Sequence, residues 1–156
     1  MIFDIGIYQL DIDTEKTKLF YTNADSIGCN CDGCRNYAQA VKSLPSPVLQ
    51  FFHQFGIDPE KPAEVYANYA PSKDTVHYGG FYHVCGTILA GTEPWVYIDP
   101  NCYHLDDQYQ IQLSKDHSVY FTQQIHLLEN GFPQPVIQIE IVFIMPWVLN
   151  EPNPYL

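Results

Sequence analysis

Apolar and polar residues follow three successive patterns along the chain, and the first of them predicts a β-hairpin. Residues 2 to 12 and 17 to 22 are rich in Ile, Phe, Tyr and Leu, and the polar, turn-like stretch 13 to 16 separates them. Successive side chains of a strand point to opposite faces, so alternate residues are expected to face the core. The expected inward side chains are Phe3, Ile5, Ile7, Leu19 and Tyr21.

The middle of the chain carries helical patterns. One helix is expected from about residue 35 to residue 43. A second is expected to begin at Ser46 and Pro47, an N-cap and N1 pair, and to end at Gly56, because glycine readily leaves the helical conformation. A third is expected over residues 62 to 69, before a proline that cannot continue a helix.

From residue 76 onward the apolar period returns to two, which predicts a sheet. In the last expected strand isoleucines alternate with Gln138 and Glu140, so one face should be core and the other at least partly solvated. Residues 114 to 117 resemble a hairpin turn, and short connections favour antiparallel neighbours. The expected strands cover residues 80 to 90, 95 to 99, 108 to 114, 118 to 127 and 136 to 147.

Together these elements predict an α+β fold. It should consist of an N-terminal β-hairpin, two or three short helices and a mainly antiparallel sheet with the helices on one face. The chain of 156 residues is long enough for one domain with its own core, expected over residues 1 to 150. Residues 151 to 156 contain two prolines and should form an irregular tail.

The charge balance excludes some partners. Seven basic and eighteen acidic residues give a formal net charge of -11, which repels phosphate backbones and anionic lipid surfaces. We therefore expect neither nucleic acid nor a membrane as a partner. A protein partner is compatible with the negative charge. The N-terminus lacks the basic and apolar regions of a signal peptide, and no apolar stretch approaches a membrane span, so a cytoplasmic location is expected.

The clearest chemical feature is a group of cysteines. Cys29, Cys31 and Cys34 lie within six residues, and the last two form a Cys-x-x-Cys pair with an Asp-Gly insert that suits a tight turn. Five cysteines in a chain without an export signal are expected to be reduced and able to bind metal. Thiolates at this spacing are typical zinc ligands, and Arg35 together with the following helix should add positive potential beside them.

A tetrahedral zinc site needs four ligands, so the remaining ligand must come from elsewhere in the chain. His83 and Cys85 lie two residues apart in an expected strand and therefore share a face. The preferred ligand set combines Cys31, Cys34 and His83 with either Cys29 or Cys85. In the competing interpretation Cys85 is a small core residue and His83 a hydrogen-bonded strand residue.

Other sequence patterns offer alternatives to the zinc interpretation. A Cys-x-x-Cys pair at a helix start also suits thiol redox chemistry, and three close thiols suit an iron–sulfur cluster, but the surrounding spacings fit neither well. Cys102 and His104 lie in a polar segment interpreted as a solvated turn. Six aromatic residues either line a groove or, in the preferred interpretation, pack under the helices: Tyr78, Phe81, Tyr82, Trp95, Tyr97 and Tyr103.

Three stretches resemble a family of small uncharacterised bacterial proteins. They are residues 31 to 37, which contain Cys-x-x-Cys-Arg-Asn-Tyr, residues 55 to 62, which contain Gly-Ile-Asp-Pro-Glu-Lys-Pro, and residues 78 to 83, which read Tyr-Gly-Gly-Phe-Tyr-His. The resemblance implies a bacterial source and that Cys31, Cys34 and His83 lie together. It implies no activity.

The leading hypothesis is a zinc-stapled domain that acts in protein interaction rather than in catalysis. The metal would fix the start of the first helix against the sheet. One alternative is an enzyme that uses the metal for hydrolysis or the thiols for redox chemistry. Another is an acidic antagonist of a basic toxin, similar to small immunity proteins, which the charge alone supports.

Overall fold

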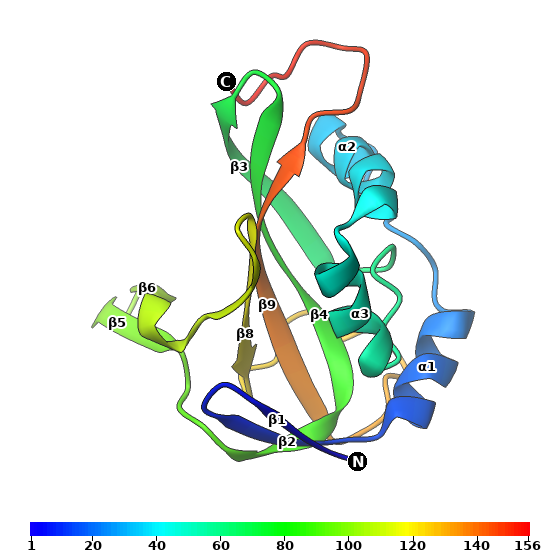
Figure 1. The fold of residues 1–156 in the computed structure, drawn as a ribbon, viewed down its shortest axis with the longest axis vertical. Helices are drawn as coiled ribbons and strands as arrows, with labels where there is room; N and C mark the ends of the chain where they lie inside the picture. Colours follow the sequence, from blue (N-terminus) through cyan, green and yellow to red (C-terminus); the bar gives the residue numbers. More distant parts are fainter.

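The computed structural model describes residues 1–156 and has the α+β fold that the sequence predicts. Three α-helices lie on one side of a seven-stranded antiparallel sheet, and a two-stranded ribbon extends from the molecule away from them (Figure 1). The helices are α1 (Thr14–Asn23), α2 (Asp32–Ala40) and α3 (Ser46–Gln54), with short 3-10 helices η1 (Val41–Ser43) and η2 (Asp107–Tyr109). The strands are β1 (Ile2–Ile5), β2 (Tyr8–Ile12), β3 (Glu64–Ser72), β4 (Thr75–Ala90), β5 (Trp95–Asp99), β6 (Cys102–Leu105), β7 (Ile111–Ser114), β8 (His117–Thr122) and β9 (Val136–Pro146).

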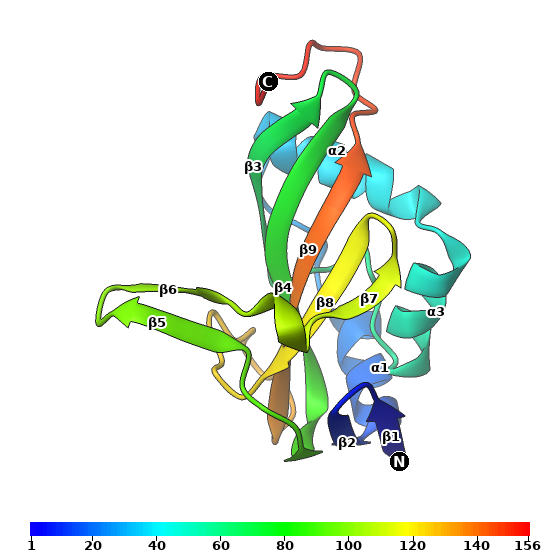
Figure 2. The same ribbon diagram turned by 60° about the vertical axis from the view of Figure 1, so that its left-hand side comes forward.

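The long strand β4 organises the sheet. The strand order is β1-β2-β4-β9-β8-β7, and β3 also pairs with β4 (Figure 2). Residues 86–90 of β4 pair with β2, whereas residues 75–81 pair with β3, so the two strands share one edge of β4. All pairings are antiparallel, as the short connections predict. No helix is long and apolar enough to cross a membrane.

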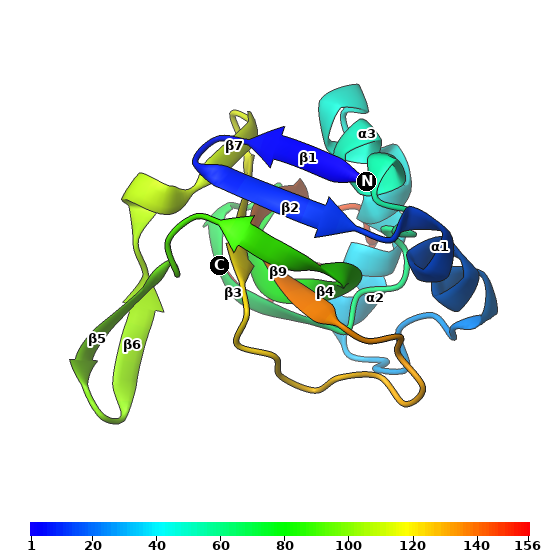
Figure 3. The same cartoon turned by 90° about the horizontal axis from the view of Figure 1, so that it is seen from below.

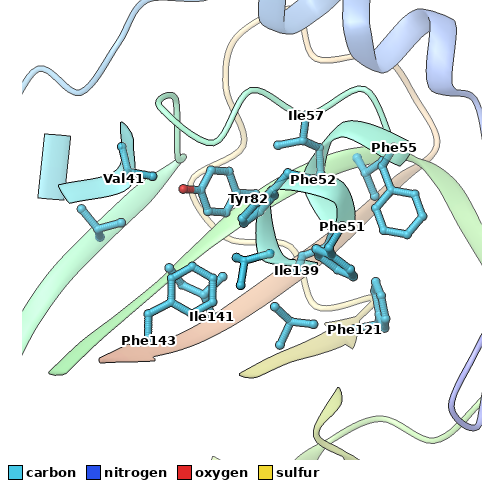
Figure 4. Close-up of a cluster of buried hydrophobic side chains, with 14 of the residues drawn as sticks. Val41, Phe51, Phe52, Phe55, Ile57, Tyr82, Phe121, Ile139, Ile141 and Phe143 are labelled. Carbon is cyan, nitrogen blue, oxygen red and sulfur yellow. The ribbon is translucent and has the colours of Figure 1, made fainter. Parts of the chain in front are cut away.

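The main core lies between the helices and one face of the sheet (Figure 4). Phe52 of α3 is fully buried, and its ring lies 4.7 Å from that of Tyr82 on β4. Ile139 and Phe143 of β9 complete this layer, as the alternation in that strand predicts. Burial of each such side chain contributes about 1.5–3 kcal/mol, so this layer supplies much of the stability of the fold.

The opposite face of the sheet differs from the expectation of partial solvation. Gln138 is fully buried and Glu140 is only 5% exposed. The β5–β6 ribbon lies on this side of the sheet, away from the helices (Figure 3). The loop after β8 also covers part of this face, where the backbone N–H of His126 donates to the side chain of Gln138, and then reaches α1, where Phe132 packs against Phe20. The sheet therefore has a second covered face, which contains buried polar side chains.

The predicted N-terminal strand pair exists, but it is contained in residues 2–12. Gly6, with φ +56°, makes the turn between β1 and β2. The expected partner strand over residues 17 to 22 is wrong, because this segment forms α1. Asp13 caps the helix by accepting a hydrogen bond from the backbone N–H of Lys16, and only every fourth side chain, Thr17 and Tyr21, is buried.

Leu19, expected inside, is 65% exposed on α1, and Ile7, also expected inside, is 52% exposed just after Gly6. The third expected helix, over residues 62 to 69, is also wrong. These residues fall largely in β3, where backbone pairing with the Gly79-Gly80 segment of β4 outweighs any helical preference. Helix α3 has Pro45 rather than Ser46 at its N-cap. It ends at Gln54, and Gly56, with φ +81°, follows the C-cap residue Phe55, in keeping with the predicted glycine stop.

Candidate metal centre

Three cysteine side chains meet at the start of α2. The Sγ atoms of Cys29, Cys31 and Cys34 all lie within 4.8 Å of one another, and those of Cys29 and Cys31 are 3.3 Å apart. All three thiols are free. Two sulfurs bound to one zinc ion at about 2.3 Å lie about 3.8 Å apart, so only small movements separate this arrangement from a coordinating one. The cluster can therefore hold a metal ion.

The local backbone explains why the sulfurs converge. Cys31 is the N-cap of α2, and its Sγ accepts a hydrogen bond from the backbone N–H of Cys34 at 3.5 Å. Helix α2 begins at Asp32, about one turn earlier than expected, so Cys34 lies in its first turn. The partial positive charge of a helix N-terminus favours thiolates at this position.

The outer and inner thiols differ in acidity. Cys29 and Cys31 are exposed, whereas Cys34 is buried. The backbone N–H of Cys31, followed by the thiols of Cys34 and Cys31, lowers the pKa of Cys29. Burial, followed by the two neighbouring thiols, raises the pKa of Cys34. A cation at the cluster would deprotonate all three, because a coordinating thiol is deprotonated outright.

Gly33, between the two cysteines of the pair, is fixed by two tyrosines. Its carbonyl oxygen accepts a 2.7 Å hydrogen bond from the hydroxyl of Tyr78 on β4, and its N–H donates to the hydroxyl of Tyr155 at 3.1 Å. A Cβ atom on Gly33 would lie 2.7 Å from the Tyr155 oxygen, so any other residue here would displace the Tyr155 side chain. The cysteine turn is thus attached to both the sheet and the C-terminal tail.

Asn36 continues this attachment one turn along α2. It is fully buried, and its amide nitrogen donates to the hydroxyl of Tyr78 and to the carbonyl of Pro146. Its side-chain oxygen accepts the backbone N–H of Val148 at 2.7 Å. The sequence offered one signal for this role, a polar residue on the helix face that otherwise carries Tyr37 and Ala40 into the core.

Arg35 does not act on the thiols as expected. Its guanidinium is paired with Asp32 at 3.0 Å and with Glu151 at 2.7 Å. Residues 151–156 contain no helix or strand, yet Glu151 and Tyr155 pack this tail against α2. Tyr155 was missed because its hydroxyl is 122 positions from Gly33 along the chain.

The structure does not bring His83 to the cysteines. Its ring is fully buried on the other face of the sheet, with Nδ1 bonded to a carboxylate oxygen of Glu129 and Nε2 to the side-chain oxygen of Gln138 at 2.9 Å. The backbone N–H of His126 also donates to that Gln138 oxygen, which fixes the orientation of the amide. Both ring nitrogens of His83 are therefore hydrogen-bonded, and neither offers a free lone pair to a metal.

Cys85 is also outside the cluster. It is buried near α1, where its backbone N–H donates to the hydroxyl of Thr17 and its thiol to the carbonyl of Gln134. This is the small core cysteine of the competing interpretation. Cys102 and His104 are exposed on the β5–β6 ribbon and not in a simple turn.

The chain thus supplies three ligands, all from the segment 29–34, and none of the other cysteines or histidines joins them. No family model matches the chain, and neither a curated protein nor a solved structure is significantly similar to it. The function therefore has to be inferred from the geometry of this site.

Proposed function

We propose that the chain binds one zinc ion through Cys29, Cys31 and Cys34, and that the ion stabilises an exposed loop used for protein interaction. The observation that carries this proposal is the convergence of three free sulfurs within 4.8 Å at a helix N-terminus. Soft thiolates in tetrahedral geometry favour zinc over calcium or magnesium, which prefer oxygen ligands. The proposal needs reduced thiols, a condition that the cytosol provides.

Few contacts within the protein hold the segment before α2 in place, and a bound metal ion would supply one. No backbone-to-backbone hydrogen bond involves residues 25–30, and among them only Ile27 packs against the core. Ordering six residues costs roughly 1–2 kcal/mol each in backbone entropy. Metal binding is a known source of folding energy in small thiolate sites, so zinc at the cluster would offset this cost.

The surroundings of the cluster favour a surface role. Cys29 and Cys31 are exposed, and none of the main cavities is lined by any of the three cysteines. The fourth zinc position therefore faces outward, where a water molecule or a side chain of a protein partner completes the tetrahedron. A partner that supplies this ligand would bind only the zinc-loaded form.

Hydrogen exchange with and without zinc tests this proposal. Zinc should slow amide exchange in residues 25–34 and raise the melting temperature, and a chelator should reverse both effects. Cys34→Ser should abolish the response, whereas the matched exposed cysteine variant Cys102→Ser should retain it. Equal responses of the two variants to zinc would refute the assignment of the cluster.

The three-ligand arrangement also favours a second function, metal-assisted hydrolysis. Catalytic zinc sites keep three protein ligands and one water, whose pKa the metal lowers to about 7. An activated ester or phosphodiester should then be cleaved by the zinc-loaded protein and not by Cys34→Ser. Zinc-dependent stabilisation without any such turnover would leave the structural function as the only one supported.

A further inference from the structure

A cavity of about 480 Å³ lies on the side of the sheet opposite to the helices, between the sheet and the β5–β6 ribbon. Figure 2 shows the ribbon extending from the molecule beside β4 and β9, away from α2. Ten residues line the cavity, and six of them, from five strands, bear on its chemistry: Glu64, Tyr66, Phe81, Trp95, Tyr103 and Glu140. The zinc proposal uses none of these residues.

Aromatic rings form much of the wall. Trp95 and Tyr103 meet edge to face, with ring centroids 5.1 Å apart. The ring of Tyr66 covers Gly79, since a Cβ atom there would lie 2.4 Å from the ring. The sequence interpretation that placed all six aromatic residues under the helices is therefore wrong for Phe81, which lines this cavity, and for Trp95, Tyr97 and Tyr103, which lie on the β5–β6 ribbon. Electron-rich ring faces of this kind attract cations.

Glu140 places a carboxyl group in the same wall. It is only 5% exposed, and the amide of Gln138, 2.6 Å away, is its one hydrogen-bond donor. Burial raises the pKa of Glu140 to about 7, and Glu64 also raises it, whereas the Gln138 hydrogen bond and His83 lower it. No lysine or arginine lines the cavity, and its basic side chains are those of His104 and His126. A carboxylate that accepts a single hydrogen bond in a buried position favours a further donor.

We propose that this cavity binds the primary ammonium group of a small alkylamine, with Glu140 accepting its hydrogen bonds and Tyr66, Trp95 and Tyr103 enclosing its alkyl chain. A primary ammonium combines the positive charge that the rings and the two glutamates attract with the N–H donors that Glu140 lacks. A quaternary ammonium offers the charge without the donors, and an alcohol offers a donor without the charge. Comparing these three ligand types separates the contribution of the positive charge from that of the N–H donors.

The test titrates the full-length protein at pH 7.5 with n-butylammonium, butyltrimethylammonium and n-butanol, followed by calorimetry and by the fluorescence of Trp95 in a Trp147→Phe background. We expect saturable one-site binding of n-butylammonium, with at least about tenfold weaker binding of the other two ligands. Comparable affinity for n-butanol would show that the positive charge does not contribute to binding and would contradict the proposal. Comparable affinity for butyltrimethylammonium would remove the role of the N–H donors.

Two variants locate the interaction on the protein. Glu140→Gln keeps the shape of the side chain and its hydrogen bond from Gln138, and it should weaken n-butylammonium binding about tenfold or more. Glu64→Gln, on the exposed rim, should weaken binding by a smaller factor and covers the case in which the Glu140 variant fails to fold. Glu15→Gln on α1 is the matched exposed control and should bind like the unaltered protein. Unchanged affinity for n-butylammonium in both cavity variants would overturn the proposal. This outcome does not depend on whether the cysteines bind zinc.

Discussion

The hydroxyl of Tyr78 donates a 2.7 Å hydrogen bond to the carbonyl oxygen of Gly33, within the turn that joins Cys31 to Cys34. Tyr78 is fully buried on the central strand β4. The attachment of the cysteine turn to the sheet is thus made by a tyrosine, whereas the sequence suggested a histidine or a cysteine of the same strand. The candidate metal site is thus connected to the sheet through a backbone carbonyl of its own turn.

Removal of this hydroxyl should weaken both folding and metal binding. Tyr78→Phe leaves the buried carbonyl of Gly33 without its donor and should lower the free energy of unfolding by about 1–3 kcal/mol. The affinity for zinc should fall as well, because the turn between the ligands loses its anchor. Denaturant unfolding and competition with a zinc indicator measure the two effects.

Tyr69→Phe is the matched control for Tyr78→Phe. Tyr69 is 52% exposed, and its hydroxyl makes no hydrogen bond within the protein. Its loss should change the free energy of unfolding by less than about 0.5 kcal/mol. If both variants lost the same amount, the anchoring role of Tyr78 would be excluded.

Zinc should protect the cluster against alkylation. In the metal-free protein Cys29, which is exposed and whose pKa is lowered, should react faster with iodoacetamide than buried Cys34. Zinc should suppress the reaction at Cys29 and Cys31. Exposed Cys102 lies outside the cluster and serves as an internal control whose rate should not change. Peptide mass spectrometry resolves the sites, and protection of Cys102 alone would contradict this assignment.

The buried carboxyl of Glu140 should make the stability of the fold depend on pH. Its pKa is about 7 in the fold against 4.5 for the free group, so the folded state holds the proton more tightly than the unfolded state does. This contribution favours folding at low pH and is lost as the pH rises from 4.5 to 7, by at most about 3 kcal/mol. Glu140→Gln removes the titration.

The variant should therefore gain stability relative to the unaltered protein between pH 5 and pH 8. Because His83 and Glu64 also act on this carboxyl, the measured quantity is the difference between the two proteins at each pH, obtained from urea unfolding. Glu15→Gln should show no such trend. A difference that stays constant over this range would contradict the burial of an ionisable carboxyl at position 140.

Replacing one apolar side chain on α3 and one on α1 by alanine tests which faces of these helices are buried. Phe52→Ala removes a fully buried ring from the core and should cost about 3–5 kcal/mol. Leu19→Ala should cost less than about 0.5 kcal/mol, because α1 exposes this side chain. A large cost at Leu19 would instead support the strand that the sequence suggested for residues 17 to 22.

Local patterns predicted the sheet, α3 and the cysteine cluster because their signals lie within a few residues. The alternating isoleucines predicted β9, and the glycine at position 56, which has a positive φ, predicted where α3 stops. Residues 17 to 22 have no strong helical period, and Asp13, which caps their helix, lies in the stretch expected to be a turn. The segment 62 to 69 became a strand because β4 offered a free edge, which is information from a distant part of the chain.

The candidate site could be predicted only in its local part. Cys29, Cys31 and Cys34 are neighbours in sequence, and no long-range contact is needed to bring them together. His83 shares β4 with Tyr78, but it points to the opposite face of the sheet, where Glu129 and Gln138 occupy both of its nitrogens. Assigning a segment to a strand shows which of its residues share a face. It does not show which of the two faces the helices cover.

X-ray absorption at the zinc edge of the purified, zinc-loaded protein tests the metal centre most directly. It should show about one zinc per chain with three sulfur neighbours at about 2.3 Å and one lighter ligand at about 2.0 Å. The sulfur count should fall in Cys34→Ser and stay at three in Cys102→Ser. Zinc bound with fewer than three sulfurs, or no stoichiometric zinc in a protein with reduced thiols, would contradict the proposed site.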